Sequence, residues 1–179
     1  MGLENYRIGE TTRWNNGGDG QNRNFALSVN SLADDAAWAG AKGSLCLQGN
    51  NKHWNRLWLA WIGWKPAALV AASTTLEVRW IPSRSPKPYV DNPFGYGGKD
   101  LLYTAQFDLE AEILAFPLIG TLTLPDANAA VVAPLVVPHL LWTAPSPYGA
   151  PIIVNRSGEA SATASADIYV EFTQVIPVR

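Results

Sequence analysis

The sequence is poor in charge. Only 16% of its 179 residues are Asp, Glu, Lys or Arg, against about 25% in an average soluble domain. This deficit indicates much buried surface, either inside the domain or against other subunits. The formal net charge is −2, and the basic residues are scattered along the chain. Because binding to nucleic acid requires a basic face, the charge pattern predicts no nucleic-acid partner.

Cysteine and long apolar runs are also scarce. Cys46 is the single cysteine, so no intrachain disulfide can form and an oxidising, secreted setting is not indicated. The longest apolar stretches, 57–64 and 129–137, are much shorter than the roughly 20 residues of a membrane-spanning helix. Residues 1–7 lack the basic and then apolar pattern of a secretion signal. The sequence therefore predicts a protein made in a cytoplasm, with no membrane partner.

Side chains that perform catalysis or bind metals are few. His53 and His139 have no ligand at metal-binding spacing, and no cluster of Cys and His is present in the sequence. Glu110 and Glu112 would lie on one strand face roughly 7 Å apart, within the range of glycosidase carboxylates. Two acids on a strand more often form its solvated face, so a hydrolase ranks last among the hypotheses. We predict no enzyme activity, no catalytic residue, no cofactor and no metal.

Tryptophan, in contrast, is abundant. Four of the eight Trp residues fall in one short segment: Trp54, Trp58, Trp61 and Trp64. Bulky apolar side chains occupy both the even and the odd positions of 57–64, which is typical of a strand covered on both faces. One face would meet the core of the domain. The other would meet a second sheet, a partner chain or a ligand.

Most of the remaining chain has the alternation of short strands. In 74–81 and 167–173, apolar side chains occupy every second position: Leu76, Val78 and Trp80 in the first segment, and Ile168, Val170 and Phe172 in the second. Further candidate strands are 116–124, 131–137, 140–143 and 151–155, with Pro134 indicating an edge strand or two short strands. Residues 31–38 resemble a short helix with Ser31 as N-cap, whereas the alternation in 106–115 favours a strand over a helix.

These elements predict an all-β fold. We expect an antiparallel β-sandwich or jelly roll of about eight strands, with one short helix and long Pro/Gly loops. Residues 1–24 include a Gly/Asn cluster at 15–22 and are predicted to form an N-terminal arm, and 25–179 to form one sandwich domain. The longest connection, 82–100, has a length that is usually functional or held by a neighbour.

Several segments resemble those of small virion structural proteins of tailed bacteriophages. They are 31–38, 76–83, 116–124, the Ile-Ile-Val-Asn-Arg-Ser-Gly turn of 152–158, and 167–173. The resemblance covers much of 31–175 and brings no catalytic residues, while the Trp54–Trp64 cluster and residues 1–24 lie outside it. It implies a non-enzymatic building block located in the virion, whose partners are copies of itself and other virion proteins. Capsid decoration or another accessory role is favoured, with fibre and tail components left open.

Candidate contact residues come from three places. They are the arm (Tyr6, Arg7 and Trp14), the long loop (Tyr89, Phe94 and Tyr96) and the face of Trp54 and Trp61, because aromatic side chains are enriched at protein interfaces.

The alternative hypothesis is a carbohydrate-binding β-sandwich used in host attachment. The aromatic rings would stack on sugar rings, and Asn50, Asn51, Asp91 and Asn92 would bind the hydroxyls. Against this, Trp58, Trp64 and Trp80 are expected to fill the core.

Overall fold

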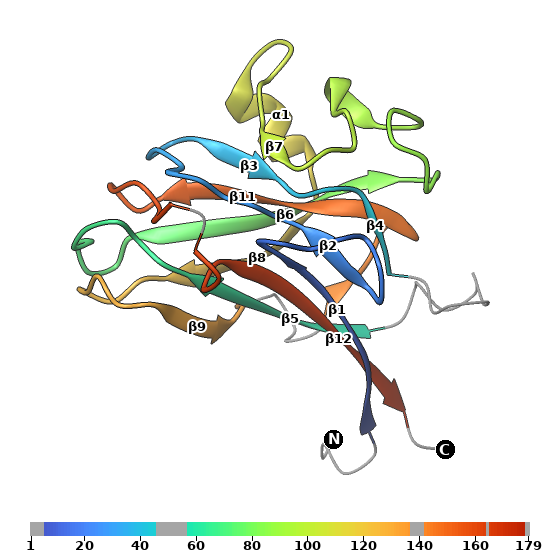
Figure 1. Cartoon of the computed structure of the whole chain (residues 1–179), viewed down its shortest axis with the longest axis horizontal. Helices are drawn as coiled ribbons and strands as arrows, with labels where there is room; N and C mark the ends of the chain where they lie inside the picture. Colours follow the sequence, from blue (N-terminus) through green and yellow to red (C-terminus); the bar gives the residue numbers. More distant parts are fainter. Residues whose placement is uncertain (1–5, 46–56, 137–141, 164, 178–179) are drawn as a thin grey trace.

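The computed structural model describes residues 6–45, 57–136, 142–163 and 165–177. It is a β-sandwich in which two six-stranded sheets face each other (Figure 1). The predicted sandwich is confirmed, and the jelly-roll connectivity stays a prediction. Apart from one parallel pair, β1 with β2, the described strand pairs are antiparallel.

The first sheet has the order β10-β5-β12-β1-β2, and β9 also pairs with β5. Its strands are β1 (Tyr6–Asn15), β2 (Asn24–Ala26), β5 (Leu57–Trp64), β9 (Val131–Pro134), β10 (Trp142–Thr143) and β12 (Tyr169–Pro177). Since β9 and β10 both lie beside β5, at one side of the sheet, the edge position inferred from Pro134 is confirmed.

The second sheet has the order β7-β3-β11-β6-β8, and β4 also pairs with β11. Its strands are β3 (Ala37–Ala39), β4 (Gly43–Ser44), β6 (Thr75–Ser83), β7 (Leu101–Leu102), β8 (Leu118–Thr123) and β11 (Tyr148–Arg156). Between β6 and β8 the chain also forms the 3-10 turn η2 (Pro93–Gly95) and the helix α1 (Leu109–Ala115).

The main core lies between the sheets and is built around tryptophan. Trp58, Trp64 and Trp80 are fully buried there, as predicted. The other apolar side chains that β6 and β12 point inward are also fully buried: Leu76, Val78, Val170 and Phe172. Trp80 has its ring centroid 5.7 Å from that of Phe172 and 5.4 Å from that of Trp142, both in edge-to-face arrangements. Such contacts add to the free energy that the rings gain from burial alone.

A second, smaller core covers the outer side of the second sheet. Residues 84–117, which include β7 and α1, lie over β3 and β11 in Figure 1. Ile81 and Ile152 of the sheet are fully buried against Tyr103, Ile113 and Phe116 of this segment. The chain thus supplies its own cover for one of its two sheets.

The N-terminal segment differs from the expected arm. Residues 6–15 form β1, which lies inside the first sheet between β12 and β2. Trp14 is fully buried, and its Nε1 donates to the carbonyl of Ala41 at 2.7 Å. The sequence of β1 gives a weak strand signal, because its polar residues alternate with only a few apolar ones. The domain therefore includes residue 6 onward, and Trp14 is a core residue instead of a contact residue.

The expected helix and one expected strand are also corrected. Residues 31–36 form bends and turns that lead into β3, and Ser31 has a left-handed φ of 47°, which is incompatible with a helix start. Residues 109–115 are helical because Asp108 caps them, its carboxylate accepting from the amide of Ala111 at 2.7 Å. The alternation of acids with apolar residues had favoured a strand there.

Candidate functional site

The first sheet exposes an apolar surface, which we call the outer face. It is the side of β1, β5, β9 and β12 that points away from the core. Strand register places its side chains in rows: Ile8, Val175 and Leu57; Thr11, Thr173 and Leu59; Arg13, Glu171, Trp61 and Pro134; and Asn15, Tyr169, Gly63 and Val132. Apolar side chains predominate on the β5 and β9 side of this surface.

Several large apolar side chains of the outer face remain in contact with solvent. Ile8 is 69% exposed and Val132 is 57% exposed, while Leu57, Leu59 and Trp61 are half-buried. Contiguous exposed apolar surface on a soluble protein usually marks an interaction site. The prediction that strand 57–64 has apolar side chains on both faces is therefore confirmed, and Trp61 lies on the accessible one.

The described charged side chains on the polar side of the outer face balance each other. The ring of Tyr169 lies over Gly63, where an added Cβ would come within 2.3 Å of it. The guanidinium of Arg13 stacks on this ring, 3.8 Å from its centroid, and its Nη1 lies 3.8 Å from the carboxylate of Glu171. Since this cation and this anion lie side by side, the described part of the surface presents no unbalanced charge to a partner.

The other predicted contact residues have mixed outcomes. Tyr89 is 65% exposed. Phe94 is half-buried, with its ring centroid 5.6 Å from that of Phe116. Tyr96 is a correction, because its ring is buried and its hydroxyl donates to the carbonyl of Gly40. The long loop is thus held against its own sheet, and Tyr89 is its exposed aromatic residue.

The remaining predicted residues fall where the structure gives no side-chain description. Tyr6 and Arg7 belong to β1, but their side chains are not described. Trp54, Asn50, Asn51, Cys46, His53 and His139 lie outside the described residues.

A pocket of about 770 Å³ lies at the end of β6, lined by residues 82–84, 91–93 and 145–147. Four of its lining residues are prolines, at positions 82, 93, 145 and 147. The other five lining residues are polar: Ser83, Arg84, Asp91, Asn92 and Ser146. No single segment of the sequence indicates this pocket, because the antiparallel pairing of β6 with β11 brings the two loops together.

Two buried polar side chains hold the walls of this pocket. The ammonium of Lys42 donates to Ser83 Oγ at 3.0 Å and to the carbonyls of Lys87 and Val90 at 2.7 and 2.8 Å. Burial lowers the pKa of Lys42, and the Asp91 carboxylate opposes that shift. On the other wall, Ser146 Oγ accepts from Trp80 Nε1 at 3.1 Å and donates to the carbonyl of Tyr148 at 2.7 Å. The walls are therefore fixed to the sheet.

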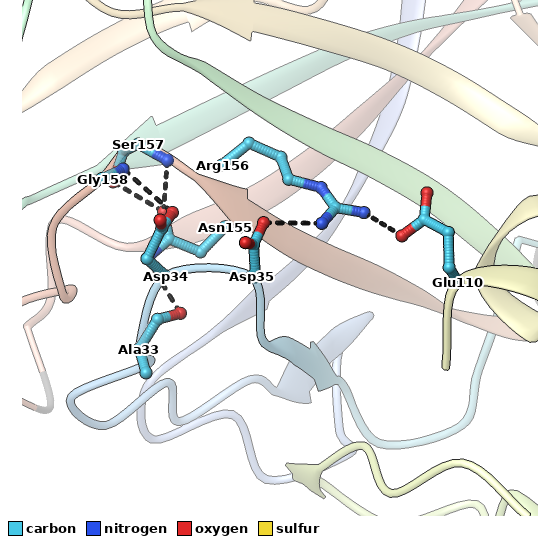
Figure 2. A network of polar contacts seen from close by, with 8 residues as sticks. All are labelled: Ala33, Asp34, Asp35, Glu110, Asn155, Arg156, Ser157 and Gly158. Atoms are coloured by element: carbon cyan, nitrogen blue, oxygen red, sulfur yellow. Dashed lines mark hydrogen bonds and ion pairs between the residues drawn. The ribbon is translucent and has the colours of Figure 1, made fainter. Parts of the chain in front are cut away.

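The acidic pair considered for glycoside hydrolysis is arranged differently from the prediction. Both residues lie on α1, two positions apart, and such residues do not face each other. Glu110 forms an ion pair with Arg156, which also donates to Asp35 at 2.7 Å (Figure 2). Glu112 is buried and accepts from Tyr103 Oη at 2.7 Å and from the amides of 106 and 107 at 2.9 Å. The carboxylates of the pair thus have separate partners.

The bond between Tyr103 and Glu112 gives a prediction at alkaline pH. Burial, followed by the hydrogen bond to Glu112 and its charge, raises the pKa of Tyr103 above the ordinary 10.0. A folded-state pKa above the unfolded one stabilises the fold fully below pH 10 and loses this contribution as the pH rises. We expect wild type to lose about 1 kcal/mol more than Tyr103→Phe between roughly pH 9 and pH 11, measured by urea unfolding at each pH.

Lys42 also has a pKa shifted by burial, but it is present in both proteins, so its contribution cancels in the comparison. Parallel stability curves for the two proteins would contradict the assigned role of Tyr103.

Within the described ranges, no group of three or more His, Cys, Asp or Glu side chains is placed to hold a metal ion. No helix in the described part of the chain has the length and apolar character needed to cross a membrane. In the comparisons with known proteins, no family model and no curated protein matches the chain.

Proposed function

We propose that the chain is a non-enzymatic structural subunit of a bacteriophage particle that assembles with copies of itself and docks on other virion proteins. Its place in the virion would be that of a capsid decoration protein or another accessory component, such as part of a fibre or tail. The resemblance of segments between 31 and 175 to phage structural proteins supports the proposed location in a phage particle. The exposed apolar side chains of the outer face support the proposed self-assembly, and the proposal depends on this observation.

The outer face is suited to a second copy of the same surface. Its partner must be apolar beside β5 and must tolerate a neutral Arg–Glu pair, and the outer face itself meets both conditions. Burying each exposed aliphatic side chain, such as Ile8 or Val132, contributes roughly 2 kcal/mol. A self-complementary surface of this kind leads to closed, symmetric oligomers.

A charge introduced into the outer face tests the proposal. Leu59→Glu places a carboxylate in the middle of the apolar side, where assembly would bury it without a partner. We expect the association constant to fall at least tenfold, measured by sedimentation velocity, while circular dichroism stays that of wild type.

The matched control is Leu102→Glu, because Leu102 lies on β7 of the second sheet and is 49% exposed. This variant should assemble as wild type does. Unchanged assembly of Leu59→Glu, or equal dissociation of both variants, would refute the role of the outer face.

A further inference from the structure

The pocket at the end of β6 combines apolar walls with a polar rim. The rings of Pro82, Pro93, Pro145 and Pro147 form C–H surfaces and, having no backbone N–H, offer no donor. Its volume of about 770 Å³ lies within the range of roughly 300–1,000 Å³ that small-molecule sites occupy. A ligand there would pack its apolar surface on the proline rings and bond to the rim.

Three rim groups have unused hydrogen-bonding capacity. The guanidinium of Arg84 and the carboxylate of Asp91 make no hydrogen bond or salt bridge within the described part of the chain, although both line the pocket. Asn92 donates its Nδ2 to the carbonyl of Tyr96 at 2.6 Å, but its Oδ1 is buried without a partner. An unpartnered buried acceptor is uncommon in a folded protein and calls for a donor.

The chemistry of the rim selects the class of ligand. Arg84 supplies donors only, whereas Asp91 and the Asn92 oxygen supply acceptors only. An anionic ligand would meet the Asp91 carboxylate, and a cationic one would meet the Arg84 guanidinium. A hydroxyl group both donates and accepts, so a neutral molecule with several hydroxyls and C–H faces satisfies all three groups and the walls. We infer that this pocket binds a short neutral saccharide.

The pocket is formed before any ligand arrives. Lys42 holds the 82–93 loop through its bonds to Ser83, Lys87 and Val90, and Ser146 holds the opposite loop through Trp80 and Tyr148. Binding therefore has little loop-ordering entropy to overcome. The inference does not rest on the proposed assembly, because the pocket residues and the outer face belong to different elements.

Titration calorimetry with defined trisaccharides tests the inference. The probes are cellotriose and tri-N-acetylchitotriose as neutral sugars, trigalacturonate as an anion, chitosan trimer as a cation, and the tripeptide Ala-Ser-Ala as a zwitterion. We expect saturable binding of a neutral sugar in preference to the other three probes. Arg84→Ala and Asp91→Ala should each weaken it about tenfold, the loss expected for one hydrogen bond to a charged group.

Asp126→Ala is the matched control, because Asp126 is exposed in the β8–β9 connection and does not line the pocket. Its affinity should equal that of wild type. The inference is overturned if none of the probes binds, or if the charged sugars or the peptide bind more tightly than the neutral sugars. Equal affinity of wild type and both pocket variants would also overturn it. None of these results bears on assembly through the outer face.

Discussion

Replacing Asn155 by alanine is expected to remove roughly 3 kcal/mol or more of the free energy of unfolding. Asn155 is fully buried at the end of β11. Its Nδ2 donates to three backbone carbonyls, those of Leu32, Ala33 and Glu159, at 2.7–3.1 Å. Its Oδ1 accepts from the amide and the hydroxyl of Ser157 at 3.1 and 2.6 Å. Figure 2 shows Asn155 with two of these partners, Ala33 and Ser157. Alanine would leave the buried backbone groups without partners.

Two further variants define the cause of the loss in urea unfolding experiments. Asn155→Asp keeps an acceptor for Ser157 but sets a carboxylate against three carbonyl oxygens, so it should destabilise at least as much as alanine. Arg156→Ala removes the partly exposed pairs with Asp35 and Glu110 and should cost about 1 kcal/mol or less. If Asn155→Asp were as stable as wild type, the bonds that Asn155 Nδ2 donates could not be its main contribution to the free energy of unfolding.

Truncating Trp80 to alanine is expected to destabilise the sandwich by about 3–5 kcal/mol, the range for large aromatic residues in cores. Trp80 is fully buried between the sheets, and its ring meets Trp14, Trp142 and Phe172 at edge-to-face distances. The change would leave a large cavity and would also remove the donor that Ser146 accepts from.

Circular dichroism in urea measures this loss without depending on tryptophan fluorescence. Trp80→Phe should lose clearly less, and Trp61→Ala, on the half-buried outer face, less than Trp80→Ala. If Trp61→Ala and Trp80→Ala lowered the free energy of unfolding equally, the assignment of Trp80 to the core and Trp61 to the outer face would be contradicted.

The strands of this fold were predictable wherever apolar residues alternate. Trp80 and Phe172 belong to segments with a clear period of two, and both lie in the core as expected. Strand β1 was missed because its inward positions include Thr12, a polar residue that is fully buried. The helix α1 was missed because a seven-residue helix spans too few turns for its period to show, and the cap at Asp108 was the available signal.

The candidate sites were predictable only in part. The apolar residues on both faces of 57–64 pointed to an accessible apolar surface, and Trp61 lies on it. The other exposed residues of this surface, Ile8 and Val132, could not be inferred, because β1, β9 and β12 come from distant parts of the chain and their order beside β5 is set by tertiary packing. The same applies to Arg84 and the 145–147 loop, which meet only through the β6–β11 pairing.

The solution mass of the wild-type chain tests self-association most directly. Light scattering on a sizing column, repeated over a series of concentrations, reports the mass of the particle. We expect a stable mass of two or more times the 19.4 kDa of one chain. A mass of one chain at every concentration would contradict assembly of the subunit through its outer face.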